Sequence, residues 1–304
     1  MAPRQHPVTR SAAQLRVAVT GATGFIGANL IARIPPHWKV VALVRRAGAE
    51  HRVATAPFPY DDLPLDSSLA SAFDVVIHLA GNTNHGLAER EPWRDVDDTA
   101  RTAALVMTRI ATRRVVVLSS AAVYAGHAGL VSPQTPVRPP MAYALSKLYA
   151  EGLVDARLAS GELESGFVVR LYNAFGPGEK PTRLIPRVAA SSGAFTLTGD
   201  PNSLSDPVHV DDVVRILIAA AESNTTGTFD LPGGDPVPLE RQITRVARAL
   251  ERPPLELEHQ PREGEIPIRF YSDVAPICDV LGVAPPEPFE SAVRRYGKAV
   301  GWIK

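Results

Sequence analysis

The sequence predicts an α/β protein in which helices cover both faces of a doubly wound parallel sheet, with a smaller lobe added towards the C-terminus. Three observations support this fold class. Short apolar runs rich in β-branched residues alternate with segments of helical period, and a glycine-rich turn directly follows the first run. The length of 304 residues also exceeds that of one average domain.

Five apolar runs are the predicted strands of the sheet. Because they are apolar throughout rather than alternating, they indicate strands buried on both faces, as in a parallel sheet covered by helices. They are Arg16 to Thr20, Val40 to Val44, Val75 to Ala80, Val115 to Leu118 and Phe167 to Leu171. The helix after the first strand is expected to bury Ile26, Leu30 and Ile34 on one face. It must stop before Pro35, since proline cannot continue a helix.

The regular alternation lapses after Arg170, where prolines become frequent, and the second lobe is expected to begin there. Two later segments are predicted to return to the sheet. They are Asp206 to Glu222 and Thr228 to Leu231, with Asp211 or Asp212 capping a helix in the first. Such a cap is preferred over a metal site at this acidic pair.

The expected domain organisation follows from this pattern. A dinucleotide-binding domain covers residues 15–173 with returning segments at about 204–233, and a substrate-binding lobe covers 174–203 and 234–304. Residues 1–14 are polar and without periodicity, so they are expected to be a mobile leader.

Composition excludes several classes of function. Lys plus Arg equals Asp plus Glu at 32 each, which gives no reason to expect binding to nucleic acid. Cys278 is the single cysteine, so neither an internal disulfide nor a zinc cluster is expected, and no metal site is predicted. No apolar stretch reaches the roughly 18 to 20 residues that span a bilayer, and no secretory signal is present. A cytoplasmic protein without a membrane partner is expected.

The glycine-rich turn is Gly21-Ala-Thr-Gly24-Phe-Ile-Gly27. Glycines between a strand and a helix allow a tight turn, and they let a pyrophosphate approach the helix N-terminus, as in Rossmann folds. A plain turn that needs glycine only for its backbone is the alternative. The predicted cofactor contacts here are Gly21, Thr23, Gly24, Phe25, Ile26 and Gly27.

This G-x-x-G-x-x-G spacing resembles the extended short-chain dehydrogenase/reductases, the family of nucleotide-sugar epimerases, dehydratases and reductases. Val76-Ile-His-Leu-Ala-Gly81 is similar to the family's fourth-strand motif, and the resemblance spans Leu15 to about Pro253. It implies cofactor contacts at Asp62, Leu63, Leu79, Ala80, Gly81 and Tyr172.

A tyrosine and a lysine lie one helical turn apart in Tyr143-Ala-Leu-Ser-Lys147, on one helix face. A neighbouring ammonium favours the phenolate, so Lys147 is expected to lower the pKa of the phenol and fit it for proton transfer. This pair alone is common on amphipathic helices. Its place 23 residues after Ser120, which ends a strand, favours catalysis. The resemblance implies that Ser120, Tyr143 and Lys147 are the catalytic residues and that Lys147 also bonds the nicotinamide ribose.

Two alanines limit the reaction. Sugar dehydratases of the family follow their serine or threonine with an Asp-Glu pair, where this chain has Ala121 and Ala122. Epimerases and ketoreductases remain. By the same resemblance Asn173 contacts the phosphate region of the substrate, Leu184 and Ile185 cradle its nucleotide base, and Ser120 and Tyr143 contact the reacting oxygen.

One departure concerns the diphosphate. Nucleotide-sugar members commonly have an arginine where this chain has Ser205. Unless Arg183, Arg187 or Arg269 replaces it, the substrate binds more weakly or is not a nucleotide sugar. His78 and His209 are expected to be packed histidines.

The end of the second predicted strand bears on the cofactor. Arg45 and Arg46 stand where NAD-preferring members have an acidic residue, and guanidinium groups suit a 2′-phosphate. NADP(H) is therefore favoured, with NAD(H) as the other possibility. This points to a ketoreductase acting on a sugar-like, nucleotide-linked ketone.

Three alternatives stay open. They are an NAD-dependent nucleotide-sugar 4-epimerase, a reductase of a non-sugar carbonyl and a non-catalytic dinucleotide sensor. The resemblance also implies a homodimer, formed by helices at about Asp95 to Ala111 and Tyr143 to Leu158.

Overall fold

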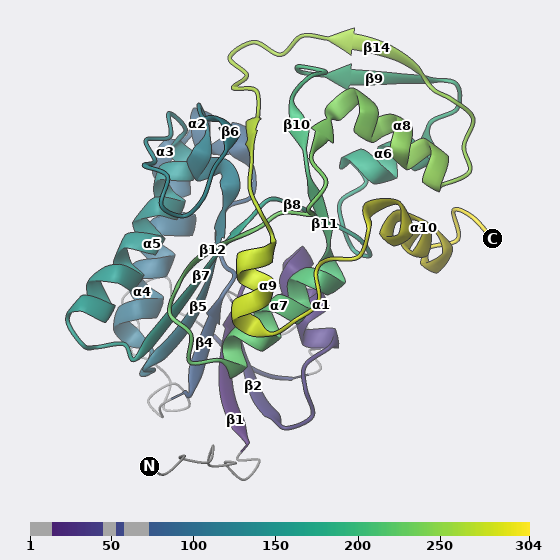
Figure 1. Ribbon diagram of the computed structural model, residues 1–304. Coiled ribbons are helices and arrows are strands. Elements are labelled where there is room, and N and C mark those ends of the chain that lie inside the picture. Colours follow the sequence, from purple (N-terminus) through teal and green to yellow (C-terminus); the bar gives the residue numbers. More distant parts are fainter. Residues whose placement is uncertain (1–13, 45–52, 58–72) are drawn as a thin grey trace, which may run out of the picture.

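The computed structural model describes residues 14–44, 53–57 and 73–304. Its centre is a seven-stranded sheet, entirely parallel, in the order β12-β7-β5-β4-β1-β2-β3 (Figure 1). The strands are β1 (Leu15–Thr20), β2 (Trp38–Val44), β3 (Ala54–Pro57), β4 (Val75–His78), β5 (Arg114–Ser120), β7 (Ser165–Leu171) and β12 (Gly227–Leu231). The predicted Rossmann-like α/β fold is confirmed. The strand order reverses between β1 and β4, and ligands bind at the carboxyl ends of strands beside such a reversal.

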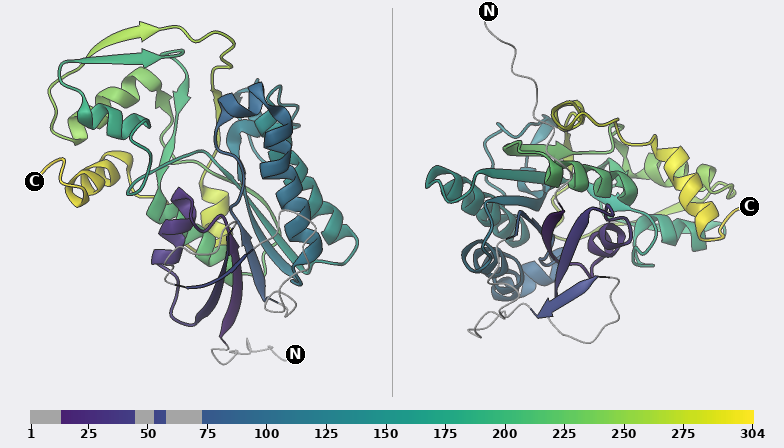
Figure 2. Two further views of the ribbon diagram at one scale, coloured as in Figure 1. Left: turned by 180° about the vertical axis from the view of Figure 1, so that it is seen from behind. Right: turned by 90° about the horizontal axis from the view of Figure 1, so that it is seen from below.

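Helices cover both faces of the sheet, as Figures 1 and 2 show. One face packs against α4 (Thr102–Arg109) and α5 (Ala142–Ala159), the other against α1 (Phe25–Ala32), α7 (Val210–Glu222) and α9 (Ala275–Leu281). Burial of the strands on both sides explains why their sequences are continuously apolar.

Helix α1 ends at Ala32, before Pro35 as predicted. The expected residues pack on the core: Leu30 is fully buried, and Ile26 and Ile34, the latter just beyond the helix end, are partly buried against the same apolar cluster. Asn29 is buried as well. Its side-chain amide donates to the carbonyl oxygens of Phe25 and Pro177, both at 2.9 Å.

The two returning segments behave differently. Strand β12 joins the sheet beside β7, as predicted. In the other segment, β11 (Pro207–His209) pairs with β8 (Asn173–Phe175) in a separate two-stranded parallel sheet. The prediction that Asp211 or Asp212 caps α7 is wrong. His209 is the N-cap, and its Nδ1 accepts from the amide of Asp211 at 3.1 Å.

The second lobe has its own apolar core and lies beyond the carboxyl ends of the central strands (Figure 1). It contains α6 (Leu184–Ala190), α8 (Leu239–Ala249), α10 (Phe289–Ala299), β9 (Ala194–Thr198) paired with β14 (Glu256–Gln260), and β10 (Leu204–Ser205) paired with β13 (Val237–Pro238). The expected lobe at 234–304 also includes α9, and here the structure differs. Ile277 and Cys278 of α9 are buried in the core of the main sheet, against α7 and β12.

Short elements surround the carboxyl edge of the sheet. They are α2 (His85–Arg90), α3 (Pro92–Asp95), the π-helix η1 (Val96–Arg101), the 3₁₀-helix η2 (Ala121–Tyr124) and β6 (Ala128–Leu130) paired with β15 (Arg269–Tyr271). Turns of π-helix often mark functional sites. Within the described ranges, no helix is both long and apolar enough to cross a membrane.

Candidate active site

The glycine-rich turn brings three backbone segments into contact at the strand reversal. Gly21 has φ 69°, and an added Cβ atom would lie 2.7 Å from the amide nitrogen of Ala80. At Gly27 an added Cβ would lie 2.1 Å from the carbonyl oxygen of Gly21. Only glycine permits both approaches, so these two residues set the path of the turn.

A cavity of about 240 Å³ opens at the N-terminus of α1. It is lined by Thr23, Gly24, Phe25, Ala28, Asn29, Pro177 and Gly178. No side chain caps this helix, so its first amides can donate to an anion. The residues present therefore fit the diphosphate of a dinucleotide. Of the predicted contacts, Thr23, Gly24 and Phe25 line the cavity. Gly21 and Gly27 set the path of the turn, and Ile26 packs against the apolar core.

The segment after β4 approaches Lys147, one of the predicted catalytic residues. Leu79 and Ala80 follow the strand, and a Cβ atom at Gly81 would lie 3.2 Å from Nζ of Lys147. His78 is buried and its Nδ1 is hydrogen-bonded to Oγ1 of Thr20 at 2.8 Å, which makes it a packed histidine as predicted. Leu79, Ala80 and Gly81 thus lie between the turn and Lys147.

The remaining predicted cofactor positions are Arg45, Arg46, Asp62, Leu63 and Tyr172. Arg45, Arg46, Asp62 and Leu63 lie outside the described residues. The ring of Tyr172 packs edge-on against Phe270, 5.9 Å between centroids, and lines neither of the two cavities described here. The structure therefore places Tyr172 in an aromatic cluster under β15 rather than at the glycine-rich turn.

Ser120, Tyr143 and Lys147 come together at the carboxyl end of β5. Ser120 ends that strand, and its Oγ accepts from the amide of Ala122 at 3.2 Å. Tyr143 and Lys147 lie in the first turns of α5, each 7% exposed. Nζ of Lys147 donates to the carbonyl oxygen of Leu118 at 3.1 Å and lies 5.9 Å from the centre of the Tyr143 ring.

Burial dominates the electrostatics of this pair. It lowers the pKa of Lys147 to about 8, and the negative charges of Asp95 and Glu151 oppose that shift. Burial raises the pKa of Tyr143, although the Ser120 hydroxyl and the charge of Arg183 act in the opposite direction. The sequence predicted a lowered pKa for this phenol. That prediction is wrong for this structure, because loss of hydration outweighs nearby charge.

A buried polar network connects Glu151 of α5 to neighbouring strands of the central sheet. Nη2 of Arg170 donates to Oε2 of Glu151 at 2.7 Å, and its Nη1 donates to the Tyr124 hydroxyl at 2.8 Å. That hydroxyl donates to Oδ1 of Asp230 at 2.9 Å. The Ser119 hydroxyl also donates to Glu151. Sequence reasoning missed this network, although Glu151 follows Lys147 by one further helical turn on the same face.

Two more titratable residues lie beside Tyr143. Asp95 is completely buried. Its Oδ1 accepts from Asn82 at 2.8 Å, while Oδ2 has no hydrogen-bond partner. The His85 ring lies 4.2 Å from the Tyr143 ring, centre to centre, with a tilt of 32°. Neither residue belongs to a pattern that the sequence displays, because each comes from a short helix after β4.

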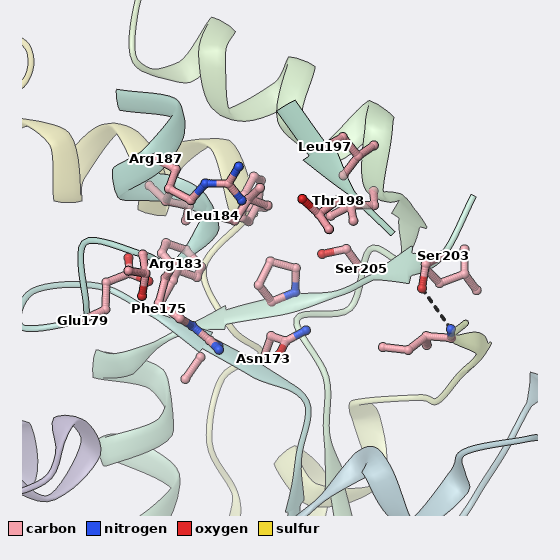
Figure 3. Close-up of a pocket in the computed structure, with 18 of the residues that line it drawn as sticks. Asn173, Phe175, Glu179, Arg183, Leu184, Arg187, Leu197, Thr198, Ser203 and Ser205 are labelled. Atoms are coloured by element: carbon pink, nitrogen blue, oxygen red, sulfur yellow. Dashed lines mark hydrogen bonds between the residues drawn. The ribbon is translucent and has the colours of Figure 1, made fainter. Parts of the chain in front are cut away.

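The second lobe contains a larger cavity of about 340 Å³ (Figure 3). The three predicted substrate positions specific to this lobe, Asn173, Leu184 and Ile185, all line it. The other lining residues are Ala174, Phe175, Glu179, Thr182, Arg183, Arg187, Leu197, Thr198, Ser203, Leu204, Ser205, Pro207, Leu239, Arg262, Glu265, Ile268 and Phe289. Burial raises the pKa of Glu179 to about 7.

The arginine side chains in and near this cavity differ in whether they have hydrogen-bond or ion-pair partners. Arg187 donates to the carbonyl oxygen of Thr196 at 2.7 Å, and its guanidinium lies over the Phe195 ring. Arg269 does not line the cavity and instead pairs with Asp200. Arg183 is exposed, and across the described ranges its guanidinium makes no hydrogen bond or ion pair. Of the three arginines that the sequence offers in place of the missing arginine at Ser205, Arg183 is the one that lines the cavity without a side-chain partner in the described ranges; Arg262, which the sequence did not single out, also lines the cavity and is exposed.

A model of the NAD dependent epimerase/dehydratase family matches residues 17–230. The chain belongs to this family. It is 31% identical over 258 residues to a 3-diazoavenalumate denitrifying reductase of a Streptomyces species, covering 79% of this chain and 83% of the relative. It is 29% identical to a dTDP-6-deoxy-L-talose 4-dehydrogenase (NAD(P)(+)) of Kitasatospora kifunensis, covering 94% and 96%.

A solved structure agrees with the fold. MoeE5 in complex with UDP-glucose and NAD is 27% identical to this chain and has a TM-score of 0.78. The match covers 94% of this chain and 98% of the MoeE5 chain. The family of epimerases, dehydratases and reductases makes this protein an NAD(P)-dependent enzyme, as predicted. Within the described part of the chain, no group of three or more His, Cys, Asp or Glu side chains is arranged to hold a metal ion.

Proposed function

We propose that the protein is a ketoreductase acting on a nucleotide-linked sugar ketone, with Ser120, Tyr143 and Lys147 as its catalytic residues. One observation carries this proposal. The three side chains meet at the carboxyl end of β5, and Lys147 lies against Gly81 on the side of the glycine-rich turn. A carbonyl at this point would be within reach of both the phenol and the bound cofactor.

Each residue has a role that its surroundings support. When bound, a reduced nicotinamide supplies the hydride for the carbonyl carbon. The Ser120 and Tyr143 hydroxyls donate hydrogen bonds to the carbonyl oxygen, and Tyr143 transfers its proton to that oxygen. With its pKa raised, the phenol is protonated near neutral pH and has a proton to donate, although it is a weaker acid than an ordinary phenol. Lys147, held by Leu118, stabilises the resulting phenolate by its charge.

The cavity of the second lobe is the proposed nucleotide site. Leu184 and Ile185 supply apolar contacts to the base, Asn173 a polar contact near the phosphates, and Arg183 the charge for the diphosphate. Ala121 and Ala122 lack the carboxylates that elimination of water needs, so reduction or epimerisation is favoured over dehydration.

The proposed preference for NADP(H) over NAD(H) rests on two arginines in the sequence. Arg45 and Arg46 favour NADP(H), and a reducing cofactor pool favours net reduction over epimerisation with NAD(H). A cytoplasmic location agrees with this use of NADPH and belongs to the same proposal.

A reductase of a non-sugar carbonyl is the second candidate. Two observations favour a substrate that is not a nucleotide sugar: Ser205 stands where a diphosphate-binding arginine is common, and a relative at 31% identity is named a 3-diazoavenalumate denitrifying reductase. The two candidates differ in whether the second-lobe cavity binds a nucleotide.

The deciding experiment follows NADPH and NADH oxidation with a panel of nucleotide-linked 4-keto sugars and aromatic ketones. Turnover of a nucleotide-linked ketone, faster with NADPH, is the expected result. Turnover of aromatic ketones alone would replace the proposed substrate class, and interconversion of sugar epimers without net oxidation of NADPH would replace reduction by epimerisation.

The expected homodimer has a candidate surface. Trp93, Val96, Leu145 and Tyr149 are 49–61% exposed. Val96, Leu145 and Tyr149 lie on the helical segments that the sequence assigned to dimerisation, and Trp93 lies just before the first of them. A second copy would cover them. Light scattering should give twice the chain mass of 32.6 kDa, and Leu145→Arg should give the monomer. A wild-type mass near 32.6 kDa at working concentration would contradict this assembly.

A further inference from the structure

We infer that His85 determines substrate specificity by binding the sugar part of the substrate beside its reacting carbon. This inference rests on the proposed function, since it assigns a contact within the same site. His85 is not one of the three catalytic residues, and it lies outside the glycine-rich turn.

The position of the ring supports this role. His85 begins α2 and stacks on Tyr143 at 4.2 Å between ring centres. The residue is exposed. A group bound at the Tyr143 hydroxyl therefore has the imidazole as its immediate neighbour. No side chain that the structure describes forms a hydrogen bond with either ring nitrogen, so both are available to a ligand.

Charges from both lobes act on this ring. Burial against its neighbours lowers the pKa of His85, and the positive charges of Arg183 and Lys147 act in the same direction. Asp95 and Glu89 oppose them. A lowered pKa keeps the imidazole neutral near pH 7, so one nitrogen donates a hydrogen bond and the other accepts one. This pair of functions suits a hydroxyl group, which also donates and accepts.

The influence of Arg183 on His85 also indicates how a substrate would lie. Arg183 borders the cavity proposed for the nucleotide, and it affects the pKa of both His85 and Tyr143. A substrate whose diphosphate contacts Arg183 would extend its sugar towards Tyr143 and His85. The nucleotide and the sugar therefore have separate contacts, which can be removed one at a time.

The test compares binding of a nucleoside diphosphate with binding of the corresponding nucleotide sugar by calorimetry. His85→Phe keeps a ring against Tyr143 and removes both nitrogens. We expect the dissociation constant for the nucleotide sugar to rise roughly three- to tenfold, as for loss of one or two hydrogen bonds, with the diphosphate unaffected. His85→Gln should recover part of this affinity. His259→Phe on β14 changes an exposed histidine outside both cavities and should alter neither constant.

The outcomes separate the two proposals. Equal affinity of wild type and His85→Phe for the nucleotide sugar would overturn the role of His85 alone, as would equal weakening of the diphosphate. Failure of wild type to bind either nucleotide would overturn the proposed substrate class, and the inference with it.

Discussion

The site around Tyr143 and the second-lobe cavity are built in different ways. Beside Tyr143 several polar groups are buried and hydrogen-bonded within the protein, as in the bond from Lys147 to the Leu118 carbonyl oxygen and the ion pair of Arg170 with Glu151. In the cavity, Arg183 and Arg262 are exposed. If the proposed function is right, the chemistry depends on a fixed scaffold, whereas substrate choice depends on surface side chains that can change without disturbing the fold.

Removal of the Tyr143 hydroxyl should have the largest effect. Tyr143→Phe should lower kcat roughly 10²- to 10⁴-fold, because the proton donor is lost, and should leave cofactor affinity nearly unchanged. Tyr149→Phe is the matched control, since that tyrosine lies on the same helix but is 49% exposed. Steady-state rates and cofactor titration measure both effects. Near wild-type turnover of Tyr143→Phe would remove this residue from the mechanism.

Two substitutions in the glycine-rich turn should distinguish a loss of fold stability from a loss of cofactor affinity. A Cβ atom at Gly27 would collide with the Gly21 carbonyl at 2.1 Å, so Gly27→Ala should lower the free energy of unfolding by about 1–3 kcal/mol or more. At Gly24 the nearest contact is 3.2 Å, so Gly24→Ala should retain most of the stability and weaken the cofactor. Thermal unfolding with and without cofactor distinguishes the two. Equal melting temperatures of both cofactor-free variants would contradict this division.

The same contrast explains what the sequence could predict. The glycine-rich turn and the pair of Tyr143 with Lys147 are local patterns, because each is set by one turn of backbone or one helix face. Asp95 and His85 reach the site from separate short helices, so no fixed spacing in the sequence relates them to Tyr143 and Lys147. Two predictions were wrong because they depend on the folded structure. Burial removes water from the Tyr143 phenol and raises its pKa, and His209 is the N-cap of α7 because β11 ends there.

In the exposed region, a smaller effect is expected from Arg183→Ala. If this guanidinium binds the diphosphate, its removal should weaken a nucleoside diphosphate about tenfold, within the range of hydrogen bonds to charged groups. Melting temperature should not change, since the structure shows no side-chain partner for Arg183 in its described ranges. Arg269→Ala is the control, because Arg269 pairs with Asp200 outside the cavity. Equal diphosphate affinity of wild type and Arg183→Ala would assign the anion contact elsewhere.

The smallest effect should come from a buried charge that touches no ligand. Asp95 raises the pKa of Lys147, which stands at about 8, and Glu151 acts in the same direction. Activity that requires the Lys147 ammonium is present below this pKa and is lost as the pH rises through it. Asp95→Asn removes the charge and retains an acceptor for Asn82, so the alkaline limb of kcat/KM should move down by about one pH unit. The pKa of Tyr143, which Asp95 also raises, should move in the same direction. Asp97→Asn changes an exposed carboxylate nearby and should leave the profile in place. An unchanged limb in Asp95→Asn would show that the buried scaffold does not tune the reaction electrostatically.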